Sequence, residues 1–273
     1  ALKEDPCALP GILGVTPDKA PVAPGYNPPA GAPNTQKTPP PTGNATSAPK
    51  EPVPVPAPST VSELMDQATV FILSIGREGA GSGSGFFVAP GVIVTNRHVA
   101  QEPDARIYVG NKILGGMYKA QIIAFSDDEA RDYALLRVIP ALAAKAPVLQ
   151  ISDTINRTDR VSAWGFPGYI TEMDPKLAAL AEGDIKSVPE VVYSEGVVSV
   201  VLDKKPPMVL HTAALSQGNS GGPLINSQGG VVGINTMLRT AGTSNAQTGI
   251  ALSSKDLILF MQQHGVAAAM SAK

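Results

Sequence analysis

Residues 218–224 read Gly-Asn-Ser-Gly-Gly-Pro-Leu, which places Ser220 between glycines and just ahead of a proline. Glycine adopts positive φ readily and lets a ligand approach the main chain closely. A serine on such a bend presents its hydroxyl outward, while the N–H groups of Gly218 and Ser220 point to a common spot. The pattern is typical of a nucleophilic serine beside an oxyanion hole. The alternative is an ordinary glycine-rich turn.

The order of histidine and acid along the chain separates two hydrolase architectures that contain such a serine. In an α/β-hydrolase both residues follow the serine. Here only Asp256 and His264 follow Ser220, in a stretch that we expect to be one helix, so both cannot reach it. Upstream lie His98 and Asp132. Their order before the serine is that of chymotrypsin, so His98, Asp132 and Ser220 are the candidate catalytic residues.

The two upstream residues have side chains suited to activating a serine. The pKa of histidine lies near neutrality, so His98 can take a proton from Ser220 and return it to a leaving group, although it could instead be a structural histidine. Asp132 precedes the apolar run 133–136, where a buried carboxylate needs a partner, and it would orient the imidazole. Neighbouring acids compete for this role and could simply be solvated: Asp127, Asp128 and Glu129.

Composition excludes several functional classes. The chain has 273 residues, a net charge of -2 and 43% hydrophobic residues, which describes a soluble globular protein without electrostatic bias toward nucleic acid. No apolar run is long enough to span a bilayer. No ligand cluster suggests a metal, and the expected chemistry needs no cofactor. Cys7 is the single cysteine, which we interpret as an incidental linker residue.

Residues 1–58 form a separate compositional segment. They contain sixteen of the 26 prolines and almost no large apolar side chains. Such a segment cannot bury enough surface to offset its ordering entropy, so we expect a disordered, partly polyproline-II tether. The alternative is a docking site for a partner protein or the cell wall. We expect the folded domain at 59–265 and a short tail at 266–273.

From residue 61 onward, short β-rich runs recur between turn residues. Six runs and then six more, with little helix between them, predict an all-β fold of two six-stranded antiparallel β-barrels at about 61–150 and 155–252. The first set comprises Thr69–Ile75, Gly83–Val88, Val92–Thr95, Arg106–Val109, Lys119–Phe125 and Tyr133–Val138. The second comprises Val161–Gly165, Gly196–Leu202, Met208–Thr212, Pro223–Asn226, Val231–Met237 and Thr248–Leu252.

Two segments have helical signals. Asp174 and Pro175 precede 176–182, which predicts a short capped helix within an insertion at about 167–189. An insertion of this size is either a functional lid or a tolerated surface loop. A C-terminal α-helix is expected at 253–264, with an apolar face that packs on a barrel.

The quoted motifs together resemble a trypsin-like (chymotrypsin-fold) serine protease, and most of all the protease domain of bacterial high-temperature-requirement (HtrA, Deg-type) enzymes. The resemblance covers about 61–264. It implies an extracytoplasmic serine endopeptidase, periplasmic or secreted and made with a signal peptide, that processes or degrades polypeptides through an acyl-enzyme. One alternative is a protease-shaped chaperone or binding module that no longer turns over, and another is an esterase. The matching segments are Gly83–Phe86, Thr95–Val99, Asp132–Leu136, Gly165–Gly168, Glu195–Ser199, Thr212–Leu224 and Gly233–Thr236.

The same resemblance implies substrate-binding residues. Ala214 would lie at the base of the primary pocket, with Gly233, Ile234 and Asn235 along its wall. No acid is present there to hold lysine or arginine, so we expect a small or medium apolar residue before the cut. His211 could modify the pocket or could simply be a strand residue.

The chain also departs from its relatives. HtrA-type enzymes usually carry a C-terminal PDZ domain, and this sequence ends soon after the expected terminal helix, so we expect no such domain here. Asn219 stands where digestive enzymes have an aspartate that pairs with a newly cut N-terminus. Activation by cleavage therefore lacks its electrostatic partner. We expect control by loop rearrangement instead, involving the 167–189 insertion and residues 238–248.

Overall fold

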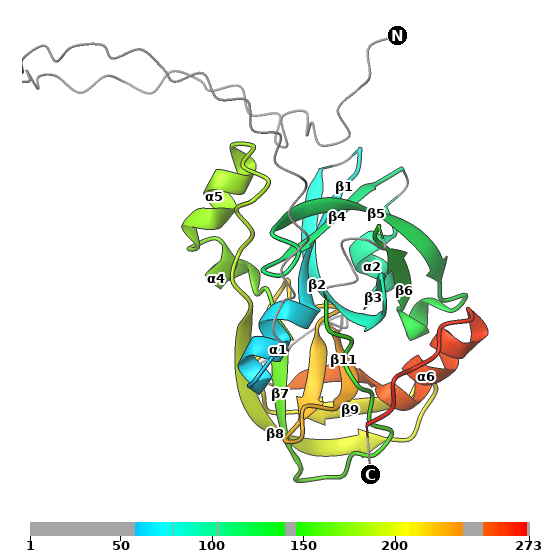
Figure 1. Cartoon of the computed structure of the whole chain (residues 1–273). Coiled ribbons are helices and arrows are strands. Elements are labelled where there is room, and N and C mark those ends of the chain that lie inside the picture. The colour runs from blue at the N-terminus through cyan, green and yellow to red at the C-terminus, as the bar shows by residue number, and fades with distance from the viewer. Residues whose placement is uncertain (1–57, 78, 103, 140–145, 237–247, 272–273) are drawn as a thin grey trace, which may run out of the picture. The chain divides into compact units, whose positions relative to one another are not determined.

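The computed structural model describes residues 58–271 except 78, 103, 140–145 and 237–247. The described chain forms two closed antiparallel β-barrels, which Figure 1 shows as the cyan-to-green strands and the light-green-to-orange strands. The predicted tether, residues 1–58, lies outside the described residues except for Pro58. Among the helices described, none has the length and apolar character needed to cross a membrane.

Both barrels use the same order of neighbouring strands. Around the first the order is β1-β2-β3-β6-β5-β4, and around the second it is β7-β8-β9-β12-β11-β10, so the predicted fold class is confirmed. The first barrel consists of β1 (Thr69–Ile75), β2 (Ala80–Ala89), β3 (Val92–Thr95), β4 (Arg106–Asn111), β5 (Gly116–Phe125) and β6 (Ala134–Arg137). The second consists of β7 (Arg160–Gly165), β8 (Val192–Leu202), β9 (Met208–His211), β10 (Pro223–Asn226), β11 (Val231–Thr236) and β12 (Gly249–Ser253).

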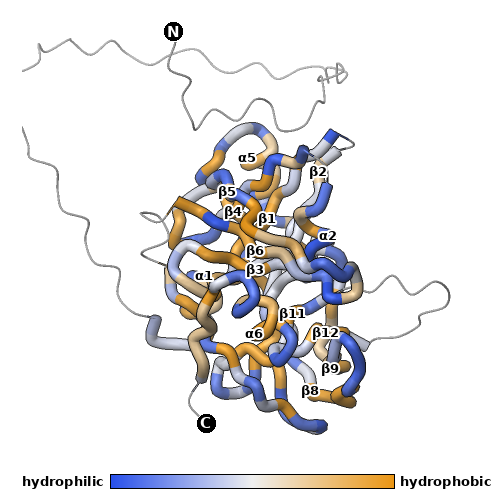
Figure 2. The backbone as a smooth tube through the Cα atoms, turned by 90° about the vertical axis from the view of Figure 1, so that its right-hand side faces the viewer, coloured by the Kyte–Doolittle hydropathy of each residue, from blue (hydrophilic) through white to orange (hydrophobic). Residues whose placement is uncertain are grey.

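Alternation along the strands divides the apolar side chains among separate cores. In β1, Val70 and Ile72 point into the first barrel, whereas Phe71 packs on the opposite side. A further cluster joins the two barrels and contains Phe86 of β2 and Ile234 of β11. Figure 2 shows apolar residues following the strands of both barrels. Because this shared cluster is buried, the two barrels are held against each other, and the loops at their junction have fixed neighbours.

Six short helices complete the described chain: α1 (Val61–Ala68), α2 (Arg97–Ala100), the 3₁₀ helix η1 (Glu129–Arg131), α4 (Gly168–Thr171), α5 (Pro175–Ala181) and α6 (Ser254–Gln263). The sequence patterns predicted α5 and α6 but not the others. A signal for α1 was present. Thr60 accepts the N–H of Glu63 through its hydroxyl, and the Glu63 carboxylate accepts the N–H of Ser59. These contacts form a variant of the capping box.

Helix α6 packs beside the loop that precedes β6. Its residues Leu257, Phe260 and Met261 are buried in the cluster shared by the barrels. The Phe260 ring stacks on Tyr133 with centroids 5.3 Å apart. Tyr133 directly follows Asp132 in the chain, so the C-terminal helix supports the segment that carries the candidate catalytic acid.

The insertion at 167–189 packs on the first barrel. The carbonyl of Ile185 accepts the N–H of Met117 in β5 at 2.8 Å. Phe166, just before the insertion, meets Phe71 of β1 edge-on at 5.4 Å, and Leu180 of α5 is buried in the same cluster. The insertion therefore connects the end of β7 to the first barrel.

Candidate active site

His98 and Asp132 meet at one end of the first barrel. His98 lies in α2, directly after β3, and Asp132 lies just before β6. Because β3 and β6 are paired neighbours, the two side chains emerge at the same edge of the sheet. The His98 Nδ1 atom is 2.8 Å from Asp132 Oδ2, and the main-chain N–H of His98 donates to Oδ1 at 2.9 Å. Nε2, the other ring nitrogen, has no hydrogen-bond partner among the described residues.

The backbone of Asp132 is constrained by its neighbours. Its φ of 39° lies in the left-handed region, which is uncommon for a residue other than glycine. Its carbonyl accepts the Arg97 N–H at 3.0 Å and the Asn96 side-chain amide at 2.9 Å. Thr236, at the end of β11 in the second barrel, donates its hydroxyl to Asp132 Oδ2 at 3.1 Å. The carboxylate thus has fixed donors from both barrels.

The competing acids do not share this position. Asp127 and Asp128 are exposed, and Asp128 Oδ1 accepts the N–H of Ala130 within its own turn. Of the acids weighed in the sequence, Asp132 is the one for which the described structure gives a contact with His98.

Ser220 lies at the junction of the barrels, opposite the segment that carries His98. Its side chain is largely buried, and its carbonyl accepts the N–H of Ser84 in β2 at 2.9 Å. Gly83 lies between the two segments: a Cβ at Gly83 would be 2.7 Å from Val99 Cγ1 and 3.3 Å from the Ser220 carbonyl oxygen. The residue after His98 and the candidate nucleophile therefore flank the same glycine.

Two N–H groups of the Ser220 loop are available for an oxyanion. In the described part of the chain, the N–H groups of Gly218 and Ser220 donate to no acceptor, whereas Asn219 N–H donates to Ser216 at 3.1 Å. The carbonyl of Gln217 accepts the N–H of Gly168 at 2.7 Å. Because the peptide bond is planar and trans, the Gly218 N–H then points away from Gly168.

Gly218 itself cannot be replaced without strain. Its φ is 97°, and a Cβ there would lie 2.3 Å from the carbonyl oxygen of Phe166. Glycine is the residue that tolerates both the positive φ and the close approach of that carbonyl. The packing of the loop against the end of β7 therefore accounts for the glycine before Asn219.

The predicted substrate-binding residues occupy two different places. Ala214 lines a hollow of about 90 Å³ beside Asn219, and its carbonyl accepts the Ser194 hydroxyl at 2.7 Å. Gly233, Ile234 and Asn235 are buried in β11, and Ile234 belongs to the cluster shared by the two barrels. Residues 237–247, which follow them in the chain, lie outside the described residues, so the role of Gly233, Ile234 and Asn235 in substrate binding stays a prediction.

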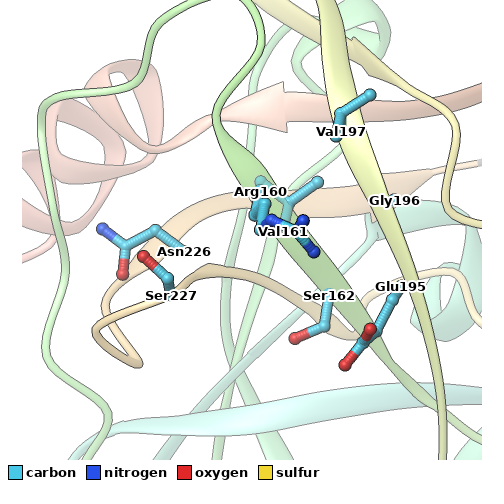
Figure 3. A pocket seen from close by; sticks show the side chains of 8 residues that line it. All are labelled: Arg160, Val161, Ser162, Glu195, Gly196, Val197, Asn226 and Ser227. Atoms are coloured by element: carbon cyan, nitrogen blue, oxygen red, sulfur yellow. The ribbon is translucent and has the colours of Figure 1, made fainter.

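A larger hollow of about 360 Å³ lies on the outer face of the second barrel (Figure 3). It contains none of the candidate catalytic residues, so its size does not make it the active site. Its lining comes from β7, β8 and the end of β10: Arg160, Val161, Ser162, Glu195, Gly196, Val197, Asn226 and Ser227.

A sequence profile described as "Trypsin-like peptidase domain" matches residues 83–234, which span the candidate catalytic residues. The chain belongs to this family. Magnetosome formation protease MamE from Paramagnetospirillum magneticum is 37% identical over 182 residues, covering 66% of this chain and 23% of that protein. Serine protease HTRA1 from Xenopus laevis is 35% identical over 170 residues, covering 61% of this chain and 34% of that protein.

The predicted resemblance to HtrA-type serine proteases is therefore confirmed, although the chain matches only about a quarter to a third of the length of these relatives. A crystal structure of the serine endoprotease from Yersinia pestis is similar in fold. It has a TM-score of 0.56 and 24% identity, and the match covers 77% of this chain and 68% of that chain.

Two contacts in this trypsin-like domain involve residues that the sequence alone did not single out. Thr236 donates to Asp132, and Ser84 donates its hydroxyl to the carbonyl of Gly218. Both lie within motifs that carry the family resemblance, but a motif does not reveal which atom each hydroxyl contacts. Those contacts cross from one barrel to the other.

His211 is enclosed in the second barrel rather than exposed in a pocket. It has no exposed surface, and neither ring nitrogen makes a hydrogen bond of good geometry among the described residues, although the nearby main chain of Ala213 partly opposes the effect of burial. Burial is the main cause that lowers the pKa of His211 from 6.5 to about 4. The imidazole is therefore neutral near pH 7, because the charged form would lose its hydration inside the barrel.

This buried histidine predicts a loss of stability in acid. The unfolded chain takes up a proton at His211 near pH 6.5 but the folded chain only near pH 4, so the stabilisation is complete above pH 6.5 and is lost as pH falls toward 4. The difference in the pKa of His211 between the folded and the unfolded chain corresponds to about 3 kcal/mol in the free energy of unfolding. Chemical denaturation across this window should show a smaller pH dependence in His211→Leu, while the exposed His264→Leu keeps the original dependence. Equal dependence in all three proteins would contradict the prediction.

A partly buried ion pair anchors the loop before Asp132. Arg131 Nε donates to Asp256 Oδ2 of α6 at 3.1 Å, and Arg131 also reaches Gln263. We expect Arg131→Ala and Asp256→Asn each to lower the free energy of unfolding by about 1 to 2 kcal/mol, since each leaves a partly buried partner unpaired. A double-mutant cycle in denaturant measures the coupling. Additive losses would show that the two side chains act independently.

Proposed function

We propose that this trypsin-like domain is a serine endopeptidase that uses Ser220, His98 and Asp132. The observation that carries the proposal is the Asp132 carboxylate bonded to Nδ1 of His98, together with a glycine-flanked serine in whose loop two N–H groups have no acceptor among the described residues. These are the base, the orienting acid, the nucleophile and the oxyanion donors that acyl transfer needs.

The reaction proceeds in two stages. Ser220 Oγ attacks the carbonyl carbon of the substrate while His98 Nε2 takes the hydroxyl proton. The N–H groups of Gly218 and Ser220 stabilise the negative oxygen of the tetrahedral intermediate. The intermediate collapses as the imidazolium gives its proton to the leaving amine, and an acyl-enzyme remains. Water, deprotonated by His98, then attacks the acyl-enzyme and releases the second product.

We assign Asp132 two tasks in this sequence. Its carboxylate holds His98 in the tautomer that keeps Nε2 free as a base, and its charge stabilises the imidazolium that forms during attack. The hydroxyl of Thr236 and the main-chain N–H of His98 support these tasks by keeping both carboxylate oxygens in place.

We assign polypeptides as the substrates. Ala214, the residue predicted at the base of the pocket, borders a hollow of about 90 Å³, and it offers no charge to a basic side chain. The absence of charge on Ala214 supports a preference for substrates with a small or medium apolar residue before the cleaved bond. The names of the relatives, serine protease HTRA1 and magnetosome formation protease MamE, support proteolysis. We also propose a periplasmic or secreted location, with a role in protein processing or quality control.

A second candidate is a binding or chaperone module without turnover. The observation that favours it is the burial of Ser220, which is only 5% exposed. An occluded nucleophile requires movement of nearby loops before a polypeptide can reach it. Control by the 167–189 insertion fits this requirement, since Gly168 at its start holds the carbonyl of Gln217.

An unfolded polypeptide separates the two candidates. The purified chain should cut it into fragments that mass spectrometry identifies, with small or medium apolar residues before the cuts. His98→Ala should stop fragmentation while the fold is retained. His264→Ala, a change at an exposed histidine, should leave the rate of fragmentation unchanged. If wild type and His98→Ala both prevent aggregation of the polypeptide and neither produces fragments, the result would favour the chaperone function and refute the peptidase function.

A further inference from the structure

Ser84 of β2 contacts the candidate oxyanion loop from the other barrel. Its side chain has no exposed surface. The hydroxyl donates to the carbonyl of Gly218 at 2.6 Å and accepts the N–H of Phe166 at 2.9 Å. Its main-chain N–H donates to the carbonyl of Ser220 at 2.9 Å. One residue of the first barrel thus contacts both residues whose N–H groups face the expected oxyanion.

These contacts orient successive peptide planes of the loop. The Ser84 hydroxyl fixes the carbonyl of Gly218, and Gly168 fixes the carbonyl of Gln217 on the other side of Gly218. Gly218 has a positive φ of 97° and lacks a side chain that could limit its rotation. The peptide plane that carries its N–H is held through the carbonyl of Gln217, and the next plane, which carries the Gly218 carbonyl and the N–H of Asn219, is held by Ser84. The relative orientation of these two planes therefore depends on partners outside the loop.

The Ser84 side chain is itself held in one position. The hydroxyl donates a hydrogen bond to the carbonyl of Gly218 and accepts one from the N–H of Phe166, so main-chain groups set the directions of both bonds. Its carbonyl accepts the hydroxyl of Thr95 at 2.7 Å. A buried and fully bonded serine holds its partner more rigidly than an exposed one, because every alternative rotamer would leave buried groups unpaired.

We infer that Ser84 is a positioning residue for the oxyanion hole: without touching the substrate, it holds the 218–219 and 220–221 peptide planes, which adjoin the planes that carry the Gly218 and Ser220 N–H groups. The inference rests on the proposed peptidase function and adds a residue to it. Removing the hydroxyl leaves the carbonyl of Gly218 and the N–H of Phe166 without their partner. The loop then loses the contact that aims its donors at the charge that develops in the transition state.

The expected effect is on kcat rather than on KM. A displacement of the N–H donors by a fraction of an ångström reduces the stabilisation of the transition state much more than it reduces substrate binding. Ser84→Ala should therefore lower kcat by roughly 10- to 100-fold with KM nearly unchanged. Ser84→Cys, which retains a weak donor of similar size, should fall between wild type and Ser84→Ala.

The test compares peptide hydrolysis with binding of a peptide aldehyde, which forms a tetrahedral adduct at the serine and places an oxyanion in the hole. Affinity for the aldehyde should fall in parallel with kcat in Ser84→Ala. Ser74→Ala is the matched control, because Ser74 is a buried serine of the neighbouring strand β1 whose hydroxyl has no partner among the described residues. It should leave kcat and aldehyde affinity near the wild-type values.

The outcomes distinguish failure of the positioning role of Ser84 from failure of the peptidase function. Unchanged kcat and aldehyde affinity in Ser84→Ala, or losses equal to those of Ser74→Ala, would overturn the positioning role while the peptidase function stands. A wild type that neither hydrolyses peptides nor binds the aldehyde would refute the peptidase function and this inference with it. If circular dichroism shows that Ser84→Ala is unfolded, the kcat and aldehyde affinity of Ser84→Cys are compared with those of Ser74→Ala instead.

Discussion

Replacing Ser220 with alanine is expected to abolish peptide hydrolysis while the fold is retained. The change removes the atom that would form the acyl-enzyme, so kcat should fall by roughly 10⁵- to 10⁶-fold. The Ser220 contacts to the rest of the protein in the described structure use its main chain, notably the carbonyl that binds Ser84. Thermal unfolding should therefore occur close to the wild-type temperature.

Labelling with a fluorophosphonate measures this directly, because the reagent reacts with an activated serine. Wild type should incorporate one label, found by mass spectrometry at Ser220, and Ser220→Ala should incorporate none. Ser216→Ala is the matched control, since Ser216 lies in the same loop and its hydroxyl has no partner among the described residues. Equal labelling of wild type and Ser220→Ala would assign the nucleophile elsewhere.

Changing Asp132 to asparagine is expected to lower kcat by roughly 10⁴-fold without unfolding the domain. The amide is nearly the same size as the carboxylate, but its nitrogen is a donor. If that nitrogen faces His98 Nδ1, the ring must accept there and carry its proton on Nε2, where it cannot act as a base. The imidazolium formed during attack would also lose the negative charge that stabilises it.

Peptide hydrolysis across pH tests this assignment. Asp132→Asn should show the loss at every pH where wild type is active, whereas Asp128→Asn should match wild type, because Asp128 is exposed and bonds only within its own turn. A large loss in Asp128→Asn together with normal rates in Asp132→Asn would reverse the choice between the two acids.

Strand positions were predictable because they depend on local alternation of apolar and polar residues. The runs Thr69–Ile75, Val92–Thr95 and Pro223–Asn226 have the predicted bounds as strands. Helix α1 was missed although Ser59, Thr60 and Glu63 cap its start and its apolar residues recur at helical spacing, because only eight residues carry that pattern, at the border of a proline-rich segment.

The candidate site was only partly predictable. The residue types and their order along the chain pointed to Ser220, His98 and Asp132 because acyl transfer requires those functional groups. Gly233, Ile234 and Asn235 were predicted to form a pocket wall; all three are buried in β11, and their role in substrate binding stays a prediction. Which strand residues reach a surface depends on how the two barrels pack, and strand periodicity carries no information on that packing.

By itself, the sequence determined the class of fold and the chemical groups of the site, because strand alternation, turn glycines and the order of three functional residues are local properties of the chain. The tertiary structure alone decided that Thr236 bonds to Asp132 and that Ser84 bonds to Gly218. The physical reason is that each of these bonds joins one barrel to the other. They form only when burial of the shared apolar cluster brings together strands that lie 104 and 134 residues apart in sequence.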